Sequence, residues 1–131
     1  RKRNALFRAA NASERRDDFE LAMRFLLLAD TLKPTPQSKF VLGAAALRVA
    51  QTALTEAPTL TDKNESCAIA RLGQETIPLA RASLEAGTDV SAEAAQQFLQ
   101  YLDETTPNVN RQTDPFCPRP APAGKQGLSP R

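Results

Sequence analysis

The sequence contains no histidine, no clustered cysteines and no glycine-rich loop, and each absence excludes a class of chemistry. Without histidine the chain lacks the commonest general base and the commonest metal ligand in proteins. Its two cysteines, Cys67 and Cys117, are too far apart for a zinc pattern or a haem attachment motif. No glycine-rich segment precedes a predicted helix, so no phosphate-binding loop is predicted. We therefore expect no catalytic residue, no metal and no cofactor, and we predict that the protein is not an enzyme.

The distribution of apolar and basic residues predicts neither a membrane span nor a nucleic-acid interface. The most apolar stretch, residues 40–50, is interrupted by Arg48 and is shorter than the roughly 18 apolar residues that a membrane-spanning helix needs. The formal net charge is only +2, and Lys and Arg cluster only in Arg1-Lys2-Arg3. That trio is either a solvated terminus or the flank of a removed signal or membrane anchor. The expected partner is a protein or a larger protein complex.

Apolar periodicity and capping residues predict an all-α fold without a convincing strand. The length of 131 residues fits one domain. Prolines, acidic caps and glycines mark where the predicted helices begin and end. The expected helices, which form antiparallel hairpins, cover about residues 4–15, 19–33, 37–54, 63–86 and 92–104.

Two residues near the end of the fourth predicted helix constrain its backbone. Pro78 lies inside the helical pattern, where its ring clashes with a preceding carbonyl and its nitrogen donates no hydrogen bond. We expect a kink there, or two shorter helices. Gly87 follows the last apolar residue and predicts a cap in the left-handed conformation.

The composition changes at residue 105, where prolines begin to alternate with polar residues and glycines. Such a segment has too few apolar residues to build a core. We therefore expect an α-helical domain over residues 1–104, followed by an extended Pro-rich tail over residues 105–131.

Cys67 and Cys117 are predicted to form a disulfide bond. Cys67 lies in the first turn of a predicted helix, and Cys117 lies in the Pro-rich segment, which needs such a link to stay on the helical domain. A disulfide favours an oxidising, extracytoplasmic location, with the protein periplasmic, secreted or at the cell surface after removal of a signal or anchor. The alternative is two unrelated thiols in a cytosolic protein.

Residues 3–36 resemble a tetratricopeptide repeat, a helical hairpin that stacks on its neighbours. Leu6 and Ala10 occupy the bulky and small positions of a first helix, and Phe19 opens the second. Small residues and a closing proline complete the match at Ala22, Ala29 and Pro34. Phe40, Ala44 and Leu47 continue it into a following first helix, whereas Asp17 stands where the family usually has a turn glycine.

The resemblance implies how the very apolar stretch FELAMRFLLLADTLKP, residues 19–34, is covered. Each repeat buries its apolar face against the next one. We expect Ala22, Leu26 and Ala29 to face the first helix, while the second apolar stripe faces the third helix. That second stripe consists of Leu21, Phe25, Leu28 and Leu32. An independent bundle of four or five helices is the alternative fold, and it would bury the same residues at its centre.

The resemblance also implies a role in binding proteins through the concave groove lined by the first helix of each repeat. The residues mapped onto this face are Asn4, Phe7, Asn11, Arg15, Val41 and Arg48. Phe7 stands out, because an exposed aromatic beside Asn and Arg is typical of a binding hot spot. Its alternative role is to pack under the N-terminal residues or against the third helix.

Two functions follow from these patterns. The first is a non-enzymatic interaction module that docks onto a partner protein through the groove or the Pro-rich tail. The second is a structural or accessory subunit of a larger extracytoplasmic assembly or filament, which would self-associate. N-glycosylation sequons occur at Asn11 and Asn64, and they matter only in an organism that glycosylates secreted proteins.

Overall fold

The computed structural model describes residues 2–117, and these residues fold into helices and connecting loops with no β-strand. The expected all-α class is therefore confirmed. The helices are α1 (Lys2–Arg15), α2 (Phe19–Leu32), α3 (Pro36–Glu56), the short 3-10 helix η1 (Ala57–Thr59), α4 (Lys63–Ala86) and α5 (Ala92–Phe116).

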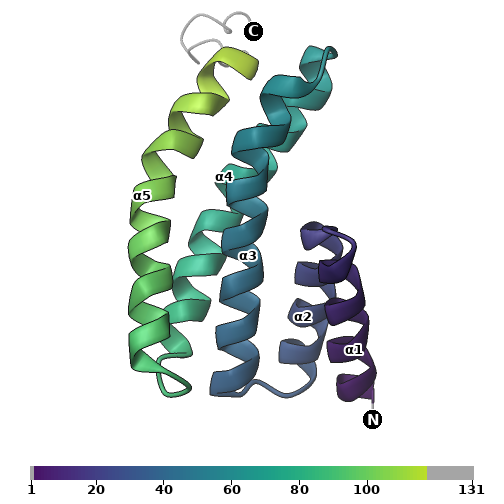
Figure 1. Ribbon diagram of the computed structural model, residues 1–131, viewed down its shortest axis with the longest axis vertical. Coiled ribbons are helices and arrows are strands. Elements are labelled where there is room, and N and C mark those ends of the chain that lie inside the picture. The colour runs from purple at the N-terminus through teal and green to yellow at the C-terminus, as the bar shows by residue number, and fades with distance from the viewer. Residues whose placement is uncertain (1, 118–131) are drawn as a thin grey trace, which may run out of the picture.

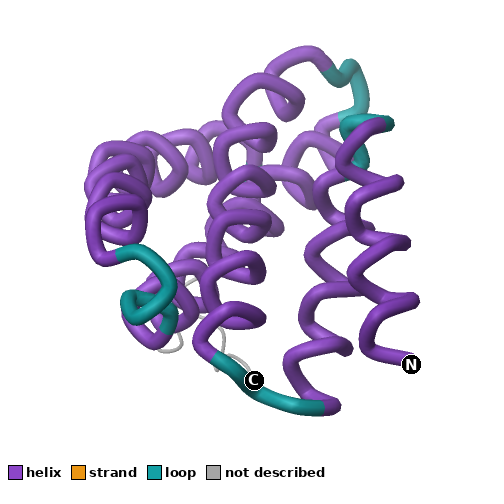
Figure 2. Tube along the Cα trace, turned by 60° about the horizontal axis from the view of Figure 1, so that its bottom comes forward, coloured by secondary structure: helices purple, strands orange, loops and turns teal. Residues whose placement is uncertain are grey.

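Helices that follow each other in the sequence pack against each other, and α3 also contacts α5 (Figure 1). The α1–α2 hairpin lies beside one half of α3, while α4 and α5 lie on its other side. Figure 2 shows the same hairpin at one edge of the molecule, joined to α3 by a single loop. The third helix is thus the centre of the fold, and the first hairpin is its outermost part.

Side-chain caps explain where most helices begin. Asp18 accepts a hydrogen bond from the backbone N–H of Leu21, and the Asp62 carboxylate accepts two, from Asn64 and Glu65. Thr35 and Ser38 form a reciprocal capping box at the start of α3. Each cap satisfies backbone donors that have no partner within the helix.

Small residues allow α3 and α4 to approach closely. A Cβ placed on Gly43 would lie 2.7 Å from Cγ and 2.9 Å from the backbone nitrogen of Leu84. A Cβ on Gly73 would lie 2.7 Å from the Cβ of Ala53. The two helices are therefore closer at these points than any larger residue would permit.

The last helix is longer than the sequence predicted. Helix α5 continues to Phe116, so the expected end near Glu104 and the expected extended backbone from residue 105 to 116 are wrong. Thr105 and Val109 are buried, which continues the apolar stripe past Leu102. Pro107 is exposed, so its ring points away from the packed side of the helix. The remainder of the predicted tail, residues 118–131, lies outside the described residues.

Two predictions for α4 are also corrected. The helix is continuous from Lys63 to Ala86 with Pro78 inside it, so the alternative of two shorter helices is wrong. Gly87 has φ −99° and is therefore not in the left-handed region. Position 87 has no room for a larger residue, because a Cβ there would lie 2.7 Å from the backbone nitrogen of Phe40.

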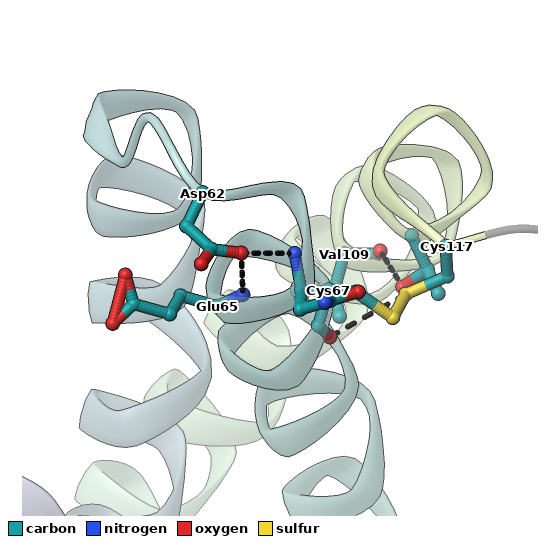
Figure 3. The surroundings of a disulfide bond; sticks show 7 residues. Asp62, Glu65, Cys67, Val109 and Cys117 are labelled. Carbon is teal, nitrogen blue, oxygen red and sulfur yellow. Dashed lines mark hydrogen bonds between the residues drawn. A yellow bond between two sulfur atoms is a disulfide. The ribbon is translucent and has the colours of Figure 1, made fainter.

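The predicted disulfide between Cys67 and Cys117 is present (Figure 3). It joins the N-terminal part of α4 to the end of α5, with the two Cα atoms 4.9 Å apart. Since α4 and α5 are antiparallel and already joined at their other ends by the loop after Gly87, the disulfide closes the open end of this hairpin. Among residues 2–117, no helix combines the length and the apolar character needed to cross a bilayer.

Candidate functional site

A groove with a volume of about 590 Å³ lies between α1 and α3. Its floor is apolar and its rim is polar, an arrangement typical of a binding site for part of another molecule. The lining residues are Arg3, Asn4, Phe7, Asn11, Glu14, Leu26, Thr35, Gln37, Val41 and Ala44.

Phe7 is the largest apolar side chain on the floor of this groove. It is half-buried and packs against the core, so it serves both the fold and the groove surface. The guanidinium of Arg3 lies 4.9 Å from the centre of its ring, at a distance suited to a cation–π contact. This contact positions a positive charge beside the aromatic floor.

Arg3 also connects α1 to the loop before α3. Its Nη2 donates a hydrogen bond of 2.9 Å to Thr35 Oγ1, while its buried Nε has no hydrogen-bond partner among the described residues. Thr35 is held in turn by its capping box with Ser38. The end of the groove is therefore fixed by side chains from both helices.

A buried carboxylate supports this end of the groove from beneath. Asp30 accepts a hydrogen bond of 2.6 Å from Ser38 Oγ and pairs with Lys39 Nζ at 2.8 Å. Burial is the largest single influence on this carboxyl and acts to raise its pKa. The hydrogen bonds from Lys39 and Ser38, together with the charges of Lys39 and Arg3, outweigh burial and lower the pKa of Asp30 below its ordinary 3.8.

A second depression of about 390 Å³ continues the groove along α3. Glu14 and Ala44 line both depressions, and Phe98 and Tyr101 of α5 form the far wall of the second one. In this second depression the guanidinium of Arg48 lies 4.6 Å from the ring centre of Phe19. The hollowed surface is thus built mainly by α1, α3 and α5, and Leu26 and Phe19 of α2 also line it.

The predicted site residues fall into three groups. Asn4, Phe7, Asn11 and Val41 line the first depression together. Arg48 lines the second depression, whereas Arg15 is exposed at the end of α1 and lines neither.

Sequence reasoning missed several lining residues, including Arg3, Glu14 and Thr35. The helical spacing of Arg3, Phe7, Asn11 and Glu14 places these residues on one face of the helix. This spacing could have identified Arg3 and Glu14 as lining residues. Thr35 could not be found from sequence, because it lies in a loop whose position depends on the packing of α3 against α2.

No set of three or more His, Cys, Asp or Glu side chains in residues 2–117 is arranged to hold a metal ion. No protein-family model, curated protein or solved structure matches this chain. The function must therefore be argued from the shape and chemistry of the groove.

Proposed function

We propose that the protein is a non-enzymatic interaction module, similar in type to a tetratricopeptide-repeat protein, that binds a segment of a partner protein on the surface built by α1, α3 and α5. The observation that carries this proposal is the continuity of the two depressions along α3 through Glu14 and Ala44. A groove that crosses several helices suits an extended chain better than a compact small molecule.

The hairpin α1–α2 supports the repeat-like character of the module. Ala10, Ala22 and Ala29 are each fully buried, at 0% exposure, where the resemblance expects small residues at the helix contact. The disulfide between Cys67 and Cys117 supports an extracytoplasmic location, because such bonds persist in oxidising compartments.

The groove residues suit recognition of a peptide by a combination of apolar and amide contacts. Phe7, Leu26 and Val41 offer an apolar floor, and the exposed amides of Asn4, Asn11 and Gln37 lie at the rim. Side-chain amides both donate and accept hydrogen bonds, so they can pair with the backbone of an extended peptide.

A random peptide array probed with wild-type protein and two matched variants tests the proposal. Asn11→Lys places a long charged side chain at the groove rim, and Asn64→Lys places the same side chain at an exposed position on α4. We expect the array signals to fall with the first variant and to persist with the second. Equal signals from both variants, or no peptide bound above background, would contradict a peptide-binding groove.

A structural subunit of a larger extracytoplasmic assembly is the second candidate function, and the exposed leucines of α2 favour it. Light scattering on purified protein separates the two functions. A monomer at all concentrations supports the module, whereas concentration-dependent self-association supports the subunit.

A further inference from the structure

An open apolar crevice lies on the outer side of the α1–α2 hairpin and is separate from the groove between α1 and α3. It has a volume of about 530 Å³ and lies on the surface of the hairpin. Its lining residues are Lys2, Ala5, Leu6, Ala9, Leu28, Thr31 and Leu32. Below we call this surface the outer crevice.

The leucines of this surface are exposed to an unusual degree. Leu28 is 54% and Leu32 55% exposed, and the neighbouring Leu27 is 42% exposed. The sequence prediction that α3 covers this stripe is wrong for Leu28 and Leu32. The reason is that α3 packs against the side of α2 that carries Asp30, as the contacts of Asp30 with Ser38 and Lys39 show.

Single exposed leucines are common on protein surfaces, but a cluster on one helix indicates an interaction site. The shape of the cluster is that of a crevice between two antiparallel helices, with alanines on the α1 wall and leucines on the α2 wall. Such a crevice receives the projecting side chains of an amphipathic helix.

The net charge of the first hairpin indicates what kind of helix the outer crevice accepts. Residues 1–33 contain eight Lys or Arg and five Asp or Glu, a net charge of +3, whereas the rest of the chain contains nine and ten, a net charge of −1. Two of the carboxylates in this part are already engaged, Asp30 with Lys39 and Glu20 with Arg24.

Two lysines at the open end of the hairpin have no such partner among residues 2–117. Lys2 lines the crevice and Lys33 follows Leu32 directly, and neither forms an ion pair within the described part of the chain. A second copy docked here crevice to crevice and in the same direction would bring the same unpaired cations together, which is unfavourable. A flat membrane surface would leave the concave crevice unfilled.

We propose that the outer crevice binds an amphipathic helix of another protein, with an apolar stripe seated against Leu6, Leu28 and Leu32 and acidic residues beside Lys2 and Lys33. This site is separate from the groove formed by α1, α3 and α5, so the protein has two binding surfaces on opposite sides of its first hairpin.

The test uses two synthetic helical peptides of about 18 residues, a length sufficient for helix formation. Both carry leucines at helical spacing, and the remaining positions are Glu in one peptide and Lys in the other. Fluorescence anisotropy measures their binding to the full chain. We expect the acidic peptide to bind at least about tenfold more tightly, a difference within reach of two complementary charge contacts.

Matched variants locate the binding. Leu28→Ser with Leu32→Ser removes two exposed leucines from the crevice, and Leu60→Ser with Val90→Ser removes two exposed apolar side chains elsewhere. The first pair is expected to weaken the acidic peptide about tenfold or more, as loss of a binding anchor does, and the second pair to leave it unchanged. Lys2→Glu with Lys33→Glu is expected to reverse the preference between the peptides.

Five outcomes overturn the proposal. The first four are equal binding of both peptides, binding that survives the loss of Leu28 and Leu32, no binding of the acidic peptide, and binding only to vesicles of anionic lipid. Self-association of the wild type that the Leu28→Ser and Leu32→Ser pair abolishes would assign the crevice to a second copy and would also overturn it.

Discussion

Asp17 closes the turn between α1 and α2 in the left-handed conformation, with φ 60°. This region is strained for residues with a side chain, although Asp tolerates it better than most. Glycine adopts this conformation without steric strain, so the backbone at Asp17 has a conformation that favours glycine.

Asp17→Gly is expected to raise the free energy of unfolding by about 0.5–1 kcal/mol, because glycine adopts this conformation without strain. Urea denaturation measures the change. The neighbouring Asp18→Ala serves as the contrast, since it removes the cap of α2 and should cost about 1 kcal/mol. A loss of stability in Asp17→Gly would show that the Asp17 side chain contributes more than its strain costs.

Asp30→Asn is expected to lower the free energy of unfolding by about 1–3 kcal/mol near neutral pH, because it removes the charged partner of Lys39 and weakens the bond from Ser38. The pKa of Asp30 is lower in the folded state than its ordinary 3.8. Its contribution is therefore complete above that value and is lost as the pH falls through the folded-state pKa.

Denaturation at several pH values checks this prediction. The stability difference between wild type and Asp30→Asn should be constant near neutral pH and should shrink on acidification below about pH 4. Asp89→Asn, at an exposed position, is the matched control. A difference that grew on acidification would contradict the assigned direction of the shift.

Phe7→Ala separates the two roles of this side chain. Phe7 is half-buried, so its removal should cost about 1–3 kcal/mol, less than the 3–5 kcal/mol that a fully buried Phe costs. The measurement is thermal or urea unfolding. A cost of about 4 kcal/mol or more would make Phe7 a core residue, and no measurable cost would mean that it contributes to the groove alone.

At the scale of the helices, apolar periodicity and caps locate the start of each element well. Asp18, Asp62 and Ser91 each stand directly before the first residue of α2, α4 and α5, and each caps that helix through its side chain. Prolines indicate the helix ends less reliably than the caps indicate the helix starts. Pro107 stands on the exposed side of α5, where it does not prevent burial of Leu102, Thr105 and Val109, and the stripe of buried residues outweighs the lost hydrogen bond.

The contact between α3 and α4 leads to a prediction at Gly43. Gly43→Ala should lower the free energy of unfolding by about 1–2 kcal/mol, because overpacking against Leu84 exceeds the gain of about 1 kcal/mol in helix propensity. The cost should be smaller when Leu84→Ala is also present, since one of the two close contacts is a side-chain atom. An unchanged or higher stability in Gly43→Ala would mean that the helices can separate without loss.

At the scale of the whole molecule, the disulfide joins the two ends of a segment with a sequence separation of 50. Replacing both Cys67 and Cys117 by Ser should lower the free energy of unfolding by about 2–4 kcal/mol, mainly because the unfolded chain gains freedom. Reduction of the wild type should lower its melting temperature to that of the double variant. If the double variant were as stable as the oxidised wild type, α5 would need no link to α4.

Part of the candidate site could be predicted from the sequence, and part could not. Asn4, Phe7 and Asn11 share one face of a helix, so their common position in the groove follows from local spacing. Their distance from Val41, Phe98 and Tyr101 depends on how three helices pack, and a single sequence carries no signal for that.

The sequence by itself determined the all-α class, the positions of the caps and the apolar character of α2, because each of these depends on residue type and on spacing within a few turns. It also determined the disulfide pair, because the chain contains only two cysteines. Only the tertiary structure decided which side of α2 is covered. Helix α3 packs on the side of Asp30, where Ser38 and Lys39 satisfy the buried carboxylate, and Leu28 and Leu32 are left open. The choice depends on pairing a buried charge across two helices, and the apolar pattern of α2 alone does not contain that information.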